Sequence, residues 1–201
     1  MFDGGLWSVS RKAGVRRAYK EIDPLPDKNS ILRAINETIC IAPYNPAWPG
    51  QFEAERSCLA QLAPCLLAIE HVGSTAVPGL AAKAVIDLMA AVPSMAVADE
   101  VVGLLCASGY VTSAEFNRSL GDRLWLMRHA DGRRTHHLHL VLPGSSHWAD
   151  TVRFRDLLRR DPSLAEEYAA LKQRLAGTLA DDRDAYTAAK THFITTALGG
   201  G

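Results

Sequence analysis

The sequence has no long apolar run and no excess charge of either sign. No stretch of its 201 residues approaches the roughly 18 consecutive apolar residues that a membrane-spanning helix requires, and its first residues lack the apolar core of a signal peptide. Its 22 Lys and Arg balance its 22 Asp and Glu, whereas proteins that bind tRNA or DNA usually present a basic surface. We therefore expect a cytoplasmic protein with neither a membrane nor a nucleic acid as its partner.

Cysteine is also scarce and has no metal-binding spacing. The chain contains four cysteines, and no two of them form a CxxC pair. This pattern predicts reduced thiols and excludes a zinc ribbon or a disulfide framework. The residues are Cys40, Cys58, Cys65 and Cys106.

The composition fits one compact globular domain with an appended segment, since 48% of the residues are hydrophobic and 22% are charged. In the first 38 residues, "SRKAGVRRAYK" is basic and weakly patterned, and "DPLPDKNS" contains two prolines. We predict an N-terminal extension and linker over residues 1–38 and one domain over 39–201. The oligomeric state stays open, because the sequence does not distinguish a solvent-facing helix surface from a dimer interface.

The apolar patterns predict an α+β fold. Short apolar runs at 66–72 and 84–92 are typical of buried strands. Two more strands, at 124–129 and 135–142, are expected to form a hairpin around Asp131-Gly132. The result is a small mixed sheet of three to five strands, flanked by helices and followed by a helical C-terminal third. Helices are predicted near 52–66, 97–109 and 147–160, from 161 onward, and at 182–198.

Three consecutive residues at the end of the first strand could hold phosphate. Gly73 lets backbone N–H groups approach a ligand closely, and the hydroxyls of Ser74 and Thr75 add hydrogen-bond donors. The motif alone is weak, because Gly-Ser-Thr occurs in many ordinary turns.

A single carboxylate, Asp87, interrupts the second apolar strand. With a period of two residues, Val85, Asp87 and Met89 share one face of that strand. Burying a carboxylate without a partner costs several kcal/mol. Asp87 is therefore expected either to form a structural ion pair, for example with Lys83, or to open into a functional site.

Two histidines share one face of the last predicted strand. In "THHLHLVL", His137 and His139 are two residues apart and project to the same side. They could share a metal ion, or one could act as a general base while the other binds an anion. The alternative is a pair of polar residues that line an open sheet face.

Arginines offer further anion-binding candidates. In "RFRDLLRR", Arg155 and Arg159 are spaced four residues apart on a helix, and part of this run is expected to be a salt-bridged solvent face. One arginine of the run, Arg155, is a candidate for the site. Arg123 and Arg128, which flank the hairpin strand, are comparable candidates.

The assembled pattern resembles the GrpB family. The matching segments are "PYNPAWPGQFEAER", "IEHVGSTAVPGLAAKAVIDLMAAV", "HHLHLVLPGSSHW" and "FRDLLRRDPSLAEEYAALKQRLA". They stand in order, and the resemblance covers about residues 41 to 198. Members of this family also occur fused to dephospho-CoA kinase, which implies a link to coenzyme A or nucleotide metabolism.

The resemblance implies a nucleotidyltransferase-like fold. In that superfamily a Gly-Ser turn is paired with Asp-x-Asp on the next strand, and a third acid on a neighbouring strand helps to hold Mg²⁺. Here Asp87 takes the place of the second aspartate and Val85 that of the first. The neighbouring strand offers His137 and His139 instead of an acid, and imidazole suits Mn²⁺ or Zn²⁺ better than Mg²⁺.

The leading functional hypothesis is a metal-dependent nucleotidyltransferase that uses a nucleoside triphosphate and a small-molecule acceptor. Asp87 and His139 would be catalytic, and Asp87, His137 and His139 would be the ligands of Mg²⁺, Mn²⁺ or Zn²⁺. One alternative is a catalytically silent module that binds nucleotides or anions. Another is a single-metal phosphoester hydrolase. The expected phosphate-binding residues are Gly73, Ser74, Thr75, Lys83, Arg123 and Arg155.

Overall fold

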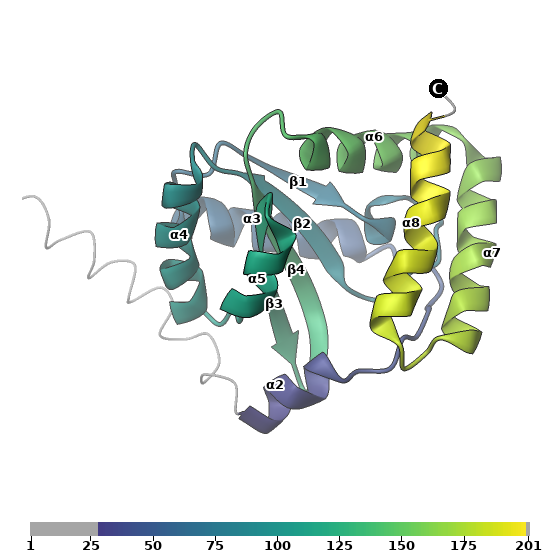
Figure 1. Cartoon of the computed structure of the whole chain (residues 1–201), viewed down its shortest axis with the longest axis horizontal. Helices are drawn as coiled ribbons and strands as arrows, with labels where there is room; N and C mark the ends of the chain where they lie inside the picture. Colours follow the sequence, from purple (N-terminus) through teal and green to yellow (C-terminus); the bar gives the residue numbers. More distant parts are fainter. Residues whose placement is uncertain (1–27, 200–201) are drawn as a thin grey trace, which may run out of the picture.

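The computed structural model describes residues 28–199 of the chain and contains a four-stranded mixed sheet in the order β1-β2-β4-β3 (Figure 1). Strand β2 runs parallel to β4, and the two outer strands, β1 and β3, run antiparallel to their neighbours. The strand bounds are β1 Ala68–Val72, β2 Ile86–Ala91, β3 Arg123–Ala130 and β4 Arg133–Val141. The predicted α+β class with a small mixed sheet is confirmed.

Helices surround the sheet and supply the last third of the chain. They are α2 Lys28–Ile35, α3 Trp48–Leu62, α4 Met95–Ala107, α5 Ala114–Leu120, α6 Ser146–Arg160, α7 Pro162–Thr178 and α8 Arg183–Gly199, with a 3₁₀ turn η1 at Ser74–Ala76. Helix α5 was not predicted. Helix α2 lies in the segment predicted as extension and linker, and residues 1–27 of that segment lie outside the described residues.

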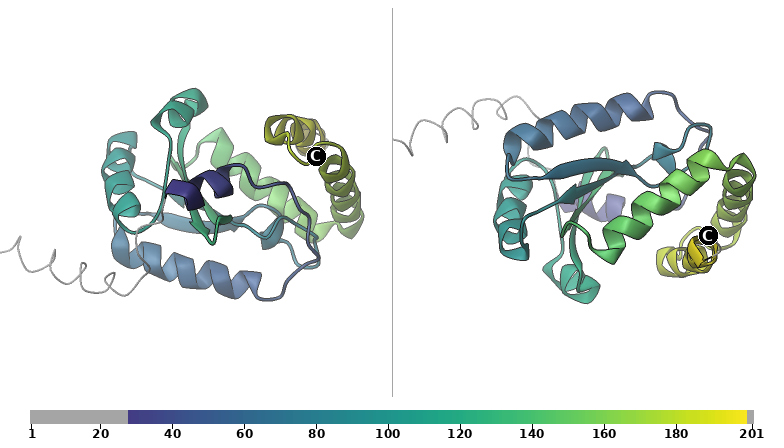
Figure 2. Two further views of the ribbon diagram at one scale, coloured as in Figure 1. Left: turned by 90° about the horizontal axis from the view of Figure 1, so that it is seen from below. Right: turned by 90° about the horizontal axis from the view of Figure 1, so that it is seen from above.

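The period-two alternation of β2 separates an apolar face from a functional one. Ile86, Leu88 and Ala90 point into the main core, which helices α3 and α4 cover. On the opposite face Met89 packs under α6, while Asp87 stays partly exposed. Figure 2 shows α3 on one side of the sheet and α5, α6 and α8 on the other.

The turn between β3 and β4 lies at Asp131-Gly132, where the sequence predicted a hairpin turn. Asp131 and Gly132 both have positive φ, 52° and 74°, as a two-residue hairpin turn of type I′ requires. Close by, the Nε and Nη2 atoms of Arg134 donate to the carbonyl oxygens of Ala34 and Ile35. These bonds fasten the end of α2 to the sheet.

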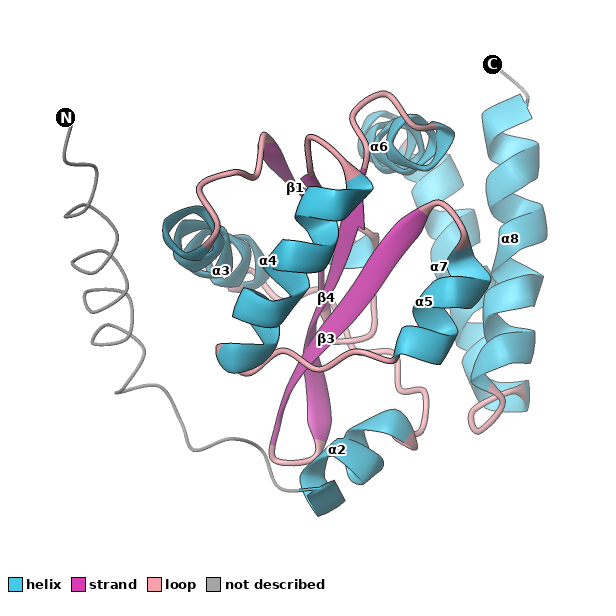
Figure 3. Ribbon diagram, turned by 60° about the vertical axis from the view of Figure 1, so that its left-hand side comes forward, coloured by secondary structure: helices cyan, strands magenta, loops and turns pink. Residues whose placement is uncertain are grey.

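The two C-terminal helices form a pair beside the sheet (Figure 3). The carboxylate of Asp161 caps α7 by accepting from the backbone N–H of Leu164 at 3.1 Å, as the Asp-Pro pattern predicts. Tyr168 of α7 packs against Phe154 of α6 and Phe193 of α8. This packing sets the positions of Lys172 and Lys190, one on each helix of the pair.

No helix within residues 28–199 is both long enough and apolar enough to cross a membrane.

Candidate functional site

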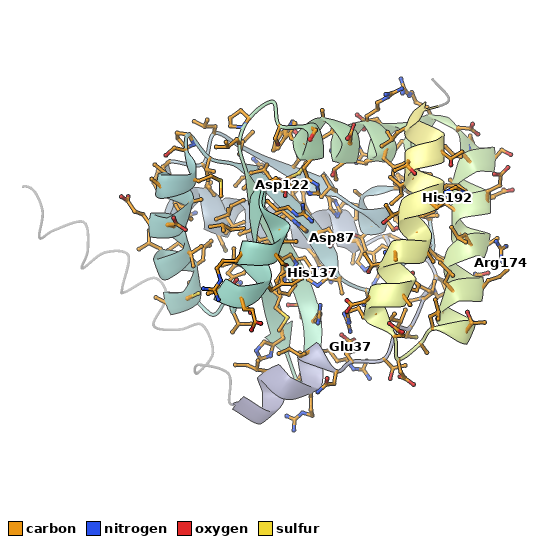
Figure 4. The ribbon with its side chains drawn as sticks, viewed as in Figure 1. Glu37, Asp87, Asp122, His137, Arg174 and His192 are labelled. Carbon is orange, nitrogen blue, oxygen red and sulfur yellow. The ribbon has the colours of Figure 1, made fainter. Side chains whose placement is uncertain are left out.

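The carboxylate of Asp87 is hydrogen-bonded to an imidazole on the adjacent strand. Residues 87 and 137 are register partners in the parallel β2/β4 pair, and Oδ1 of Asp87 lies 2.9 Å from Nδ1 of His137. The side chains of Asp87 and His137 are 30% and 17% exposed, although the Nε2 atom of His137 is itself buried. Figure 4 shows them next to each other on the sheet. His137 is thus the hydrogen-bond partner of Asp87, whereas the sequence suggested Lys83 as a partner.

The surroundings of Asp87 keep it ionised. Desolvation would raise the pKa of the carboxyl, but the hydrogen bond and charge of His137, together with the fields of His139 and Lys190, hold its pKa below the usual range. An ionised carboxylate can only accept, so Nδ1 of His137 must donate. In the neutral ring, the lone pair then lies on Nε2.

The glycine of the Gly-Ser-Thr turn is required by Asp87. Gly73 has φ +71°, and a Cβ atom at this position would overlap Oδ2 of Asp87. The turn after β1 therefore packs directly on the carboxylate. The sequence predicted a close approach of this backbone to a bound phosphate, which stays a prediction.

Ser74 and Thr75 play different roles. Ser74 is partly exposed, and its Oγ accepts a hydrogen bond from Nζ of Lys172 at 2.9 Å. Thr75 is buried, and its hydroxyl donates to the carbonyl oxygen of Val85 and lies 3.1 Å from Nε2 of His71. Of the two hydroxyls, Ser74 is the one that is bonded to a lysine, Lys172.

Lys172 was not predicted from the sequence. It is 2% exposed, donates to Ser74 and to the carbonyl oxygen of Ala81, and lies 4.8 Å from the ring centroid of Tyr168. Desolvation and the charge of Lys190 lower its pKa to about 7, although Asp87 opposes the shift. The signal was present, because Lys172 interrupts the apolar stripe of α7 one helical turn after Tyr168, as Asp87 interrupts an apolar strand.

The charge of Asp87 acts on three lysines, and two arginines act on one of these lysines, Lys83; we call the five side chains the basic cluster. Burial is the first cause that lowers the pKa of each member, and the charge of Asp87 raises the pKa of all three lysines. These lysines come from three separate segments: the loop before β2, helix α7 and helix α8. The members are Lys83, Lys172, Lys190, Arg134 and Arg183.

Of the other predicted anion-binding residues, Lys83 joins this cluster and the arginines are engaged elsewhere. Arg155 donates to Glu70 at 2.6 Å and to the carbonyl oxygen of His71. Arg123 donates to Asp122 at 2.6 Å. Arg128 pairs with buried Glu55 against the main core. Arg155 and Arg128 therefore connect separate elements of the fold, whereas Arg123 bonds to its chain neighbour and keeps a buried Nε without a hydrogen-bond partner among the described residues.

His139 occupies a different position from His137. It is the register partner of Met89, and its ring centroid lies 5.7 Å from that of His147. Burial lowers the pKa of His139 to about 3, so the ring is neutral, and its Nδ1 is buried without a hydrogen-bond partner among the described residues. The structure brings His137, and not His139, into contact with Asp87.

The donor set was tested against the metal site that the resemblance implies. Val85, at the place of the first aspartate, is 5% exposed and apolar. One oxygen of Asp87 is taken by His137 and the other packs on Gly73. Within residues 28–199 no group of three or more His, Cys, Asp and Glu side chains is arranged to hold a metal ion. The residues present do not fit a two-metal, multi-carboxylate centre.

Two surface hollows of about 470 Å³ each lie away from Asp87. One is bounded by α4, α5 and the start of β3, and it includes Arg118 and Arg123. The other lies between the loop at Pro78 and helices α6 and α7. We therefore locate the candidate site from the side chains around Asp87 and His137 and not from a surface hollow.

The fold is α+β, as the sequence predicted. An Asp-His pair stands on its sheet, and the Gly-Ser turn packs against that pair. Residues 38–199 match the family described as "GrpB protein", and the chain belongs to the GrpB family. The crystal structure of conserved protein GrpB from Enterococcus faecalis is 33% identical with a TM-score of 0.71, over 80% of this chain and 98% of that one.

Two curated relatives are longer than this chain. UPF0157 protein YqkA of Bacillus subtilis is 35% identical over 77% of this chain and 44% of its own length. A dephospho-CoA kinase of Mycolicibacterium paratuberculosis is 30% identical over 89% of this chain and 49% of its own length. The chain thus spans about half of each of these proteins.

Proposed function

We propose that the protein binds a nucleoside triphosphate at the Gly73-Ser74 turn and transfers its nucleotidyl group to a hydroxyl of a small-molecule acceptor. The observation that carries this proposal is the Asp87–His137 hydrogen bond beside that turn, with Lys172 bonded to Ser74. A positioned base and a phosphate-binding turn within one group of contacts are the parts that such a transfer needs.

In the proposed reaction each chemical role belongs to a named atom. Nε2 of His137 takes the proton of the acceptor hydroxyl, and the acceptor oxygen bonds to the α-phosphorus. The bond from the α-phosphorus to the bridging oxygen breaks, and pyrophosphate leaves with the electron pair. Asp87 stabilises the imidazolium that forms, because its carboxylate accepts from Nδ1.

A second candidate is a catalytically silent module that binds nucleotides or other anions. Val85 favours it, since the carboxylate of the first aspartate is missing. The similarity to one half of a dephospho-CoA kinase supports coenzyme A or a related nucleotide as the ligand of such a module. A phosphoester hydrolase is the third candidate, in which water would replace the acceptor.

The first experiment is thermal unfolding of the protein with a panel of nucleotides and coenzyme A. A ligand that binds only the folded state raises the melting temperature. Nucleoside triphosphates that shift the wild-type protein are then tested for pyrophosphate release with a panel of small hydroxyl acceptors. The transferase is supported by release that needs an acceptor, the hydrolase by release without one, and the silent module by binding without turnover.

Variants connect the result to the site. Asp87→Asn should abolish turnover, while Arg174→Gln, on the exposed side of α7, should behave as the wild type. Figure 4 shows Arg174 far from Asp87. Unchanged turnover in Asp87→Asn would overturn the transferase proposal.

A further inference from the structure

The members of the basic cluster outnumber the acids that act on them. The basic cluster contributes three lysines and two arginines from four separate parts of the fold. Three acids act on members of the cluster: Asp87 acts on the three lysines, Glu37 acts on Lys83 and both arginines, and Asp184 acts on Arg183. Glu37 is further tied down, since its backbone carbonyl accepts from Arg183 and its carboxylate from the backbone N–H of Arg134.

Two of the amines have unused hydrogen-bond donors. Among the residues that the structure describes, Nζ of Lys83 and Nζ of Lys190 have neither a hydrogen-bond acceptor nor an ion-pair partner. Lys190 instead lies 4.5 Å from the ring centroid of Tyr186, which leaves its three N–H groups free for a ligand. Both lysines are half-buried, so a bound anion would be partly shielded from water.

Lys172 anchors the opposite side of the cluster. Its Nζ is fixed by Ser74 Oγ at 2.9 Å and by the carbonyl oxygen of Ala81, and it is held against Tyr168. The Lys172 side chain is therefore pre-organised, and its amine fixes the position of the partly exposed Ser74 hydroxyl.

Such an arrangement is unfavourable without a ligand and favourable with an anionic one. Partly buried amines are poorly solvated, and the members of the cluster repel one another: Arg183 and Arg134 act on Lys83, and Lys190 acts on Lys172. A multiply charged anion removes both penalties at once. Charge-assisted hydrogen bonds to phosphate oxygens are about twice as strong as neutral ones.

We propose that the basic cluster binds the phosphate chain of a di- or triphosphate ligand directly, through the amines of Lys83 and Lys190 and the Ser74 hydroxyl that Lys172 holds in place, without a bridging divalent metal ion. This inference rests on the proposed function for the location of the phosphates. It also accounts for the misfit of the metal-ligand set, because lysines supply the positive charge that carboxylate-bound metal ions supply in a two-metal site.

The test is equilibrium binding of three probes, measured by titration calorimetry in EDTA and again with Mg²⁺ or Mn²⁺. The probes are ATP, inorganic tripolyphosphate and adenosine. We expect ATP and tripolyphosphate to bind in EDTA, with affinities that metal changes by less than about tenfold. Adenosine should bind much more weakly, because it has no phosphates.

Lysine variants test the atoms. Lys190→Ala and Lys83→Ala remove half-buried amines that have no bond to the fold, and each should weaken both phosphate probes about tenfold or more. Arg174→Gln is the matched control on an exposed part of α7 and should leave both affinities unchanged. Lys172→Met is a secondary variant, since the loss of its buried bonds lowers stability.

The outcomes separate this inference from the proposed function. If ATP bound only with Mg²⁺ or Mn²⁺, the transferase proposal would remain, but the proposal that lysines bind the phosphates without a metal ion would be wrong. Phosphate binding by these lysines would also be ruled out if Lys83→Ala and Lys190→Ala still bound ATP and tripolyphosphate in EDTA as the wild type does. Binding of neither phosphate probe under any condition would remove the proposed function and this inference together.

Discussion

Nδ1 of His137 donates to Oδ1 of Asp87 at 2.9 Å across the parallel strand pair β2 and β4. Because both residues project from adjacent strands of one sheet, the backbone fixes the distance between them. The bond sets the tautomer of His137 and leaves Nε2 as the reactive nitrogen, which is buried and has no hydrogen-bond partner within residues 28–199.

The pair predicts how the two residues affect turnover. His137→Gln removes the base but keeps a polar side chain of similar reach, so we expect kcat to fall by about 10²–10⁴ with little change in KM. The control is His192→Gln, on the exposed part of α8. Steady-state kinetics against a fixed acceptor provide the measurement. A rise in KM with unchanged kcat would assign His137 to binding alone.

Gly73→Ala should damage the site without touching a charged group. The φ of +71° is unfavourable for alanine, and its Cβ would overlap Oδ2 of Asp87. We expect the free energy of unfolding to fall by about 1–3 kcal/mol. Nucleotide affinity should fall as well, because Asp87 must move. Urea titration and calorimetry give the two values.

Gly79→Ala is the matched control for this substitution. Gly79 also has positive φ, +79°, but a Cβ there has no atom within 4 Å. It shares the backbone strain and lacks the overlap with Asp87. If the two variants lost nucleotide affinity equally, the contact between Gly73 and Asp87 would not be responsible.

Asp87 and Lys172 both interrupt apolar patterns in the sequence, but the sequence does not give their partners. A carboxylate in an apolar strand of period two must find a partner, so the local pattern alone makes Asp87 a candidate. Which of several histidines becomes its partner depends on strand register. Lys172 meets Ser74 across 98 residues through the packing of α7 on α6, which no local pattern encodes.

Helix α5 shows a second limit of sequence patterns. The segment 114–120 has no buried residue, so it carries no apolar stripe by which it could be recognised. Its cap at Ser113, which accepts from the backbone N–H of Phe116 at 3.2 Å, was the available signal. The hairpin, in contrast, was predictable because Asp-Gly determines its turn.

A buried ion pair on the core side of the sheet should govern stability and not activity. Glu55 is 6% exposed, accepts from the hydroxyl of Tyr110 at 2.7 Å, and pairs with Arg128 at 2.8 Å. Glu55→Gln leaves Arg128 without its counter-charge. We expect a loss of about 3–5 kcal/mol in the free energy of unfolding, measured in urea.

Glu53→Gln supplies the comparison for Glu55→Gln on the same helix. The side chain of Glu53 is 55% exposed and pairs with Arg56 three residues away. Exposed pairs of this kind contribute about 0–1 kcal/mol. Equal losses in the two variants would show that burial of the Glu55 pair does not determine its contribution.

His71 should make the fold sensitive to mild acid. The ring is 7% exposed and stacks on Phe52 at 4.7 Å. The Thr75 hydroxyl donates to the carbonyl oxygen of Val85, so Nε2 of His71 must donate to Thr75. Burial is the main cause that lowers the pKa of His71 from 6.5 to about 4, and the positive charges of Arg159 and Arg155 add to it.

The sign of the pH dependence follows from this lowered pKa. Above pH 6.5 the ring is neutral in both the folded and the unfolded chain, and its contribution is constant. Between pH 6.5 and about 4 the unfolded chain takes up a proton that the folded chain does not. As the pH is lowered through this range, His71 should therefore reduce the free energy of unfolding by up to about 1.4 kcal/mol per pH unit.

The variant that isolates this contribution is His71→Gln, because other buried histidines titrate in the same range. Glutamine can still donate to Thr75 but has no proton to gain in this window. We expect the variant to be less stable than the wild type at pH 7 and the difference to narrow toward pH 4.5, in urea titrations at several pH values. Stability curves that run parallel over this range would mean that His71 is protonated in the folded state as readily as in the unfolded one.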